Sequence, residues 1–100
     1  MANAPSVKVA ASATSVQLVA ANESRGGLSI WNAAASTNLY VSTSESGGTT
    51  TYWVKLVPGA YWEMPYCFAA PDFNVTEVVW GCWDGSPGDT DYAQVTEVSN

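Results

Sequence analysis

Basic side chains are scarce in this sequence, and histidine is absent from it. Lys8, Arg25 and Lys55 are its only positive charges against nine carboxylates, so the net charge at pH 7 is −6. Phosphate binding through counterion release needs clustered lysine and arginine. The scattered cations therefore argue against direct binding of nucleic acid. The missing histidine removes the commonest general base and the commonest zinc ligand.

Three further kinds of segment are missing. No apolar run reaches the roughly 18 residues that a membrane span needs. The first residues, MANAPSVKVAAS, lack the basic region and the apolar core of a secretory signal, so we expect use without export by that route. No phosphate-cradling glycine motif occurs. Because the usual catalytic constellations are missing, we predict a chain that is not an enzyme and that has no cofactor.

Cysteine is represented only by Cys67 and Cys82. Without a signal peptide, the favoured interpretation is two reduced and buried thiols. A single bridge between them, or a metal-binding or catalytic role, stays open as an alternative.

Most of the sequence has the pattern of β-strands. Runs rich in Val, Thr, Tyr, Trp and Ile alternate with a period of two at 6–11, 14–21, 27–32, 37–42, 50–57, 59–65, 74–83 and 92–98. Turn signals such as Gly26-Gly27 and Pro58-Gly59 separate them, at the spacing of about 8–12 residues that is typical of all-β domains. The pattern predicts a compact antiparallel β-sandwich of about eight strands, with the jelly roll as one form of it.

The domain organisation follows from the same pattern. Residues 1–12 alternate small side chains that bury little area, so they are predicted to form an N-terminal arm or a strand exchanged with another copy. Residues 13–100 are predicted to form a single sandwich domain.

The acidic stretch WDGSPGDTD, residues 83–91, is the best metal candidate. Asp84, Asp89 and Asp91 lie on a loop rich in Gly and Pro, and carboxylate oxygens suit a hard cation such as calcium. The spacing does not match an EF-hand. The alternative is an acidic turn in which the aspartates accept hydrogen bonds from nearby backbone amides.

Aromatic residues are the most informative part of the sequence. An aliphatic row is predicted to face the core: Leu28, Ile30, Leu39, Val41, Val54 and Leu56. Trp31, Tyr40, Trp53 and Trp62 then lie opposite it and point outward, and with Tyr66 they form the predicted interface. Two alternatives remain: aromatics shared between core and surface, or a platform on which sugars stack.

Four stretches carry a resemblance to a known group. These are LVAANESRGGLSIWN, then NLYV, then LVPGAYWEMP, and finally VTE near the C-terminus, and together they cover residues 16 to 98 approximately. The chain resembles small β-sandwich virion proteins of tailed bacteriophages, such as head decoration proteins, head fibres and small tail components. Departures from the group pattern occur in MPYCFAAPDF and WGCWDGSPGDTDY.

The resemblance implies structural roles for Arg25, Gly27, Pro58 and Gly59 in turns, with Arg25 donating to carbonyl groups of a neighbouring loop. It implies a multi-copy decoration or cement protein on the capsid surface, in a virion assembled in the host cytoplasm. The implied partners are the major capsid protein and copies of the chain itself. The alternatives are a tail or fibre module touching host carbohydrate, and a free carbohydrate-binding module. Head or tail location and oligomeric state stay open.

Overall fold

Eight strands account for most of the regular structure. The computed structural model describes residues 4–65 and 75–99. The strands are β1 (Ser6–Ala10), β2 (Val16–Val19), β3 (Arg25–Asn32), β4 (Leu39–Ser42), β5 (Val54–Leu56), β6 (Tyr61–Glu63), β7 (Val79–Trp83) and β8 (Tyr92–Ser99). Each alternating run in the sequence overlaps one of them, with β3 and β8 extending beyond the predicted bounds, so the predicted all-β fold with about eight strands is confirmed.

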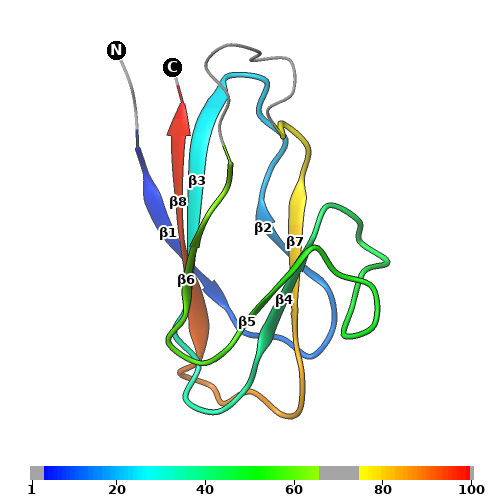
Figure 1. Cartoon of the computed structure of the whole chain (residues 1–100). Helices are drawn as coiled ribbons and strands as arrows, with labels where there is room; N and C mark the ends of the chain where they lie inside the picture. The colour runs from blue at the N-terminus through cyan, green and yellow to red at the C-terminus, as the bar shows by residue number, and fades with distance from the viewer. Residues whose placement is uncertain (1–3, 66–74, 100) are drawn as a thin grey trace.

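The strands form two four-stranded antiparallel sheets that face each other (Figure 1). We call β1-β8-β3-β6 the first sheet and β2-β7-β4-β5 the second sheet. The pairs are nested along the chain, since β1 pairs with β8, β2 with β7, β3 with β6 and β4 with β5. This nesting across two sheets is the jelly-roll arrangement. The N-terminal strand β1 pairs within its own chain, and exchange between copies stays a prediction.

The core lies between the sheets, where the inward side chains of both meet. Of the predicted aliphatic row, Val54 is half-buried against the core and the others are buried. Trp83 of β7 is fully buried beside them, although its sequence environment gives no sign of it. Alternation along each strand therefore positions the core, as expected for half-buried strands.

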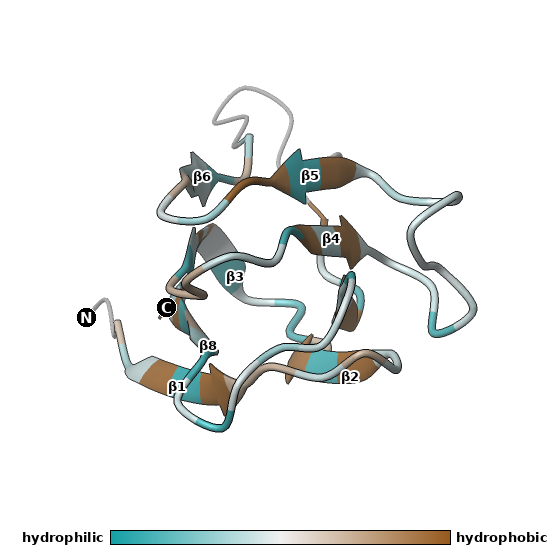
Figure 2. Ribbon diagram, turned by 90° about the horizontal axis from the view of Figure 1, so that it is seen from below, coloured by the Kyte–Doolittle hydropathy of each residue, from teal (hydrophilic) through white to brown (hydrophobic). Residues whose placement is uncertain are grey.

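A tight turn joins the two sheets at one side, where β5 lies next to β6 (Figure 2). The amide of Ala60 donates to the carbonyl of Val57 at 2.9 Å, and Gly59 has a φ of 82°. Proline followed by a glycine with positive φ is the signature of a type II turn. Pro58 and Gly59 thus occupy the kind of turn that the sequence analysis assigned to them.

The assignment of Gly26 and Gly27 to a turn is wrong. Both lie inside β3, where the register with β8 shifts between Arg25 and Gly27. Bulges of this kind often contain glycine, which explains why the pair resembles a turn signal. The turn itself comes earlier, where the amide of Arg25 donates to the carbonyl of Asn22 at 3.2 Å.

Candidate interaction surfaces

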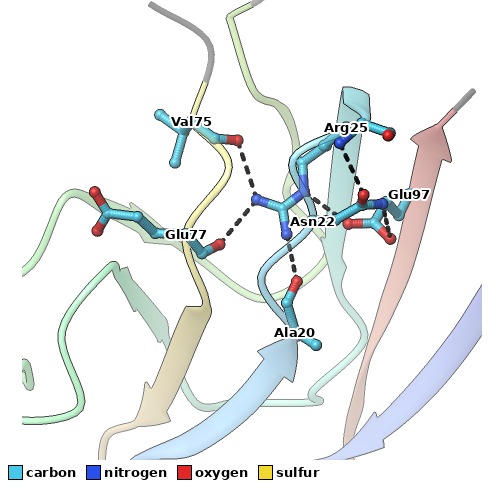
Figure 3. Close-up of polar contacts among 7 residues, drawn as sticks. Ala20, Asn22, Arg25, Val75, Glu77 and Glu97 are labelled. Atoms are coloured by element: carbon cyan, nitrogen blue, oxygen red, sulfur yellow. Dashed lines mark hydrogen bonds and ion pairs between the residues drawn. The ribbon is translucent and has the colours of Figure 1, made fainter. Parts of the chain in front are cut away.

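Arg25 closes one end of the sandwich, where β1 begins and β8 ends (Figure 1). Its side chain is 1% exposed, and its guanidinium donates to Glu97 Oε2 at 2.7 Å. The same group donates to three backbone carbonyls (Figure 3), those of Ala20 at 2.6 Å, Glu77 at 2.9 Å and Val75 at 3.1 Å. The contacts with carbonyl groups that the sequence analysis expected are therefore present, and they tie β3 and β8 to the chain beyond β2 and before β7.

Asn32 closes the opposite end of the sandwich. It continues the inward row of β3 after Leu28 and Ile30 and is fully buried. Its amide nitrogen donates to the carbonyls of Leu56 at 2.8 Å and Thr37 at 3.0 Å, and its oxygen accepts from Trp83 Nε1 at 3.0 Å and the Ala34 amide at 3.2 Å. All its donors and acceptors are thereby used. This hub was not found from sequence.

The three aspartates of residues 83–91 do not come together. Asp84 accepts from the backbone and side chain of Asn38, both at 2.8 Å. Asp91 accepts from the amides of Gly88 at 2.8 Å and Ala35 at 3.2 Å. Within residues 4–65 and 75–99, no three acidic, cysteine or histidine side chains are grouped to hold a metal ion. The contacts of Asp84 and Asp91 agree with the acidic-turn alternative, in which aspartates accept hydrogen bonds from backbone amides.

The contacts of Asp84 predict a pH effect on stability. Hydrogen bonds from the Asn38 amide and side chain lower the pKa of Asp84 below its ordinary value of 3.8. The folded state thus favours the charged carboxylate, so its contribution is present above pH 3.8 and is lost as the pH falls through the lower folded pKa. We expect Asp84→Asn to be less stable than wild type at pH 7 and the difference to shrink below pH 3.8. Urea unfolding at a series of pH values measures this difference, and a gap that widens in acid would contradict it.

Cys82 faces outward from the second sheet but is covered by the chain before β2. Its thiol donates to the carbonyl of Ala13 at 3.3 Å. Burial raises the pKa of the Cys82 thiol above its ordinary value, and the charge of Asp84 raises it further. The buried position agrees with the favoured sequence interpretation for this residue. Cys67 lies outside the described residues.

A low thiolate fraction predicts slow modification of Cys82. In a Cys67→Ser variant at pH 8, we expect iodoacetamide to label Cys82 at least about tenfold more slowly than a free cysteine, because the thiolate is the nucleophile. Mass spectrometry over time measures the rate. Labelling in urea is the control, and fast labelling of the folded chain would show that Cys82 is open to reagent.

Two of the aromatic residues predicted to form the interface are buried or half-buried rather than exposed to solvent. Tyr40 does lie on the outer face of the second sheet, but it is only 8% exposed. The ring of Tyr52 packs on the ring of Tyr40 with centroids 4.9 Å apart, and the hydroxyl of Tyr40 donates to Asp84 at 3.1 Å. Trp62 pairs with Ile30 and packs half-buried against the core, so its predicted outward direction is wrong. The short run YWEM carries no aliphatic row to fix which residues face inward.

Two other predicted aromatics are exposed, at separate places. Trp31 is 39% exposed on the outer face of the first sheet, where its ring meets Tyr92 edge to face. Trp53 is 43% exposed just before β5, beside the exposed Tyr52, and its ring lies 5.2 Å from that of Trp62. Tyr66 lies outside the described residues. Tyr52 was missed because alternation around residues 50–53 gives no clear inward row.

A groove of about 340 Å³ lies on the outer face of the first sheet, and its wall residue Tyr61 pairs with Trp31 across β6 and β3. The middle strand β3 contributes Gly26, Gly27, Leu28 and Ser29 to its lining, and because the Leu28 side chain is buried in the core, small residues form the floor. Larger residues of β6 and β8 form its walls. The walls and ends are lined by Tyr61 and Glu63 of β6, and by Thr96 and Val98 of β8. Register explains the hollow, since Ser29 lies directly between Glu63 and Thr96.

Two residues in one wall of the groove are hydrogen-bonded to each other. The hydroxyl of Tyr61 donates to Glu63 Oε1 at 2.6 Å. This bond raises the pKa of Tyr61 above 10.0, against the lowering effect of a hydrogen bond with Ser29. Tyr61 is the most exposed large side chain here, at 59%. No sequence signal pointed to the groove, because it exists only once three strands are paired.

Comparison with known proteins found no relative: the chain matches no protein-family model, no curated protein and no solved structure. Nor does the described part of the chain contain a helix of the length and apolarity that crossing a membrane requires.

Proposed function

We propose that this chain is a non-enzymatic structural subunit of a tailed-phage particle, bound in many copies to the outside of the capsid. The observation that carries the proposal is the presence of two separate exposed aromatic areas, Trp31 with Tyr92 and Trp53 with Tyr52. A subunit that bridges two neighbours needs two contact surfaces. Exposed aromatic residues commonly mark protein interfaces and carry much of the binding energy there.

Two further points support this role. The sequence resembles small virion proteins over about eighty residues, and the jelly roll recurs in viral capsid domains. Fold alone does not fix function, so the second point is an analogy. The partners are the major capsid protein and other copies of the chain. Weak contacts at each copy then add up, because neighbouring sites on one particle act together.

Copy number tests the proposal. Quantitative mass spectrometry of purified particles, with the major capsid protein as internal reference, is expected to give on the order of tens to hundreds of copies per particle. A few copies would instead indicate a tail or fibre module, which is the second candidate. The groove beside Tyr61 favours that candidate, since a module that touches host carbohydrate needs such a site. Absence of the chain from particles would contradict both.

The two aromatic areas can be tested directly. Purified Trp31→Ser and Tyr52→Ser variants are added to particles that lack the chain, and bound protein is measured after sedimentation. Each variant is expected to bind at least about tenfold more weakly, because hot-spot aromatics cost 2 kcal/mol or more when removed. Val7→Ser, at a more exposed apolar position on the edge strand β1, is the control and is expected to bind like wild type.

A further inference from the structure

We propose that the groove on the outer face of the first sheet binds a neutral saccharide. An exposed aromatic ring, a carboxylate and two hydroxyl groups meet there, from Tyr61, Glu63, Ser29 and Thr96. The ring offers a flat apolar surface for the C–H face of a sugar. The carboxylate and hydroxyl oxygens accept hydrogen bonds from sugar hydroxyls. The inference goes beyond the capsid role and holds for either location in a particle.

Size and shape agree with such a ligand. A volume of about 340 Å³ lies at the lower end of the range for ligand pockets, about 300–1,000 Å³. Gly26, Gly27 and Ser29 of β3 line the groove, so a ligand can approach the backbone of β3 closely. Val98 of β8 adds an apolar side chain to the lining. A mixture of apolar walls and a few polar groups is what fixes the orientation of small ligands.

Charge selects a neutral ligand. Glu63 is the only carboxylate among the residues that line the groove, and neither lysine nor arginine is among them. On this face Lys8 lies over the ring of Tyr92 at 4.7 Å, and neither residue is among those that line the groove. A phosphate, sulfate or uronic acid would meet Glu63 without a paired cation, at a cost in binding energy. The net charge of −6 adds to this repulsion.

The carboxylate is held ready for a ligand. Because Tyr61 donates to Oε1 at 2.6 Å, the Glu63 side chain is fixed relative to the ring. Among the described residues no hydrogen bond is made to Oε2, which leaves that oxygen as an acceptor for a sugar hydroxyl. Hydrogen bonds to charged acceptors are stronger than those between neutral groups. Fixing the acceptor in advance also reduces the ordering cost of binding.

A peptide is a poorer occupant than a saccharide. A peptide that extended the first sheet would pair with the free edge of β6, which is only three residues long. Pro65 follows soon after and has no amide hydrogen to donate. The groove lies over the face of the sheet, between side chains, and not along this edge. Its polar groups are therefore side-chain acceptors, which match a ligand rich in hydroxyls.

The test is a binding measurement on the full chain in isolation. A glycan array that carries neutral and anionic oligosaccharides is screened first. The ¹⁵N-labelled protein is then titrated with any sugar that binds, and with lactose, maltose, cellobiose and diacetylchitobiose. We expect at least one neutral sugar to shift the amide signals of Gly27, Ser29 and Thr96. Glu63→Gln and Tyr61→Ala are each expected to weaken binding about tenfold or more. Tyr61→Phe keeps the ring but releases Glu63, so it is expected to lose less.

Tyr52→Ala is the matched control, because it removes another exposed tyrosine ring, which lies over the second sheet, and it is expected to leave sugar affinity unchanged. The proposal is overturned if no neutral sugar binds, if only anionic sugars bind, or if the groove signals shift with protein concentration alone. Its failure is distinct from failure of the capsid role. Saccharide binding is read on the isolated chain, while copy number is read on particles.

Discussion

Asn32→Ala is expected to lower the free energy of unfolding by about 3–5 kcal/mol, because it leaves several buried polar groups without partners. The carbonyls of Leu56 and Thr37 lose their donor, and the indole of Trp83 loses its acceptor. Each such group costs about 1–3 kcal/mol when it stays buried and unpaired. For a domain of this size, whose total stability is about 5–15 kcal/mol, the loss is large.

Urea unfolding followed by tryptophan fluorescence measures the effect, since Trp83 is buried in the folded state. The midpoint is expected to fall with little change in slope, as for a loss of stability without a change in the exposed surface. Gln17→Ala, at an exposed position of β2, is the control and is expected to stay within about 0.5 kcal/mol of wild type.

Asn32→Asp separates the donors from the acceptor. It keeps an oxygen for Trp83 but removes the nitrogen that donates to the carbonyls of Leu56 and Thr37, and it places a charge in the core. We expect it to be destabilised at least as much as Asn32→Ala. A cost below about 1 kcal/mol for either variant would show that this end of the sandwich is held by apolar packing alone.

The strands were predictable because their signals are local. Alternation around Leu28 and Ile30 identifies one face of β3 without reference to any other strand. Pro58-Gly59 likewise specifies its own turn. The direction of Trp62 was not predictable in this way, since three residues of β6 do not define a row and only pairing with Ile30 places the ring inward.

The interaction surfaces could not be predicted from the sequence, because they depend on which segments lie side by side in the fold. Tyr40 has the alternation of an outward residue. It is covered because Tyr52, from the segment before β5, packs on its ring. The groove depends on Ser29 lying between Glu63 and Thr96, both of which follow it in the sequence by more than thirty positions. The sequence predicts which side of a strand a residue occupies, but not what a later strand places beside it.

Some contacts of Arg25 were predictable from the sequence and others were not. Its substitution is the second change for which we expect a large loss of stability. The sequence analysis expected its contacts with carbonyls, whereas its ion pair with Glu97 came only with the structure. We expect Arg25→Met to lower the free energy of unfolding by about 3–5 kcal/mol, because breaking a buried pair leaves an uncompensated charge. Urea unfolding measures it. Lys55→Met, which removes an exposed ammonium 5.8 Å from the ring of Tyr40, is the control and is expected to cost less than about 1 kcal/mol.

Arg25→Lys distinguishes charge from geometry. An ammonium keeps the attraction to Glu97, but it cannot donate at the same time to three carbonyls. The planar guanidinium does so with Nη1, which donates to Val75 and Glu77, and with Nη2, which donates to Ala20. Most of the loss seen with Arg25→Met is therefore expected to remain in Arg25→Lys. Added salt is expected to change either difference little, because a buried pair is weakly screened. Full recovery with lysine would mean that the positive charge alone holds this end of the sandwich together, and that the carbonyl contacts add nothing to stability.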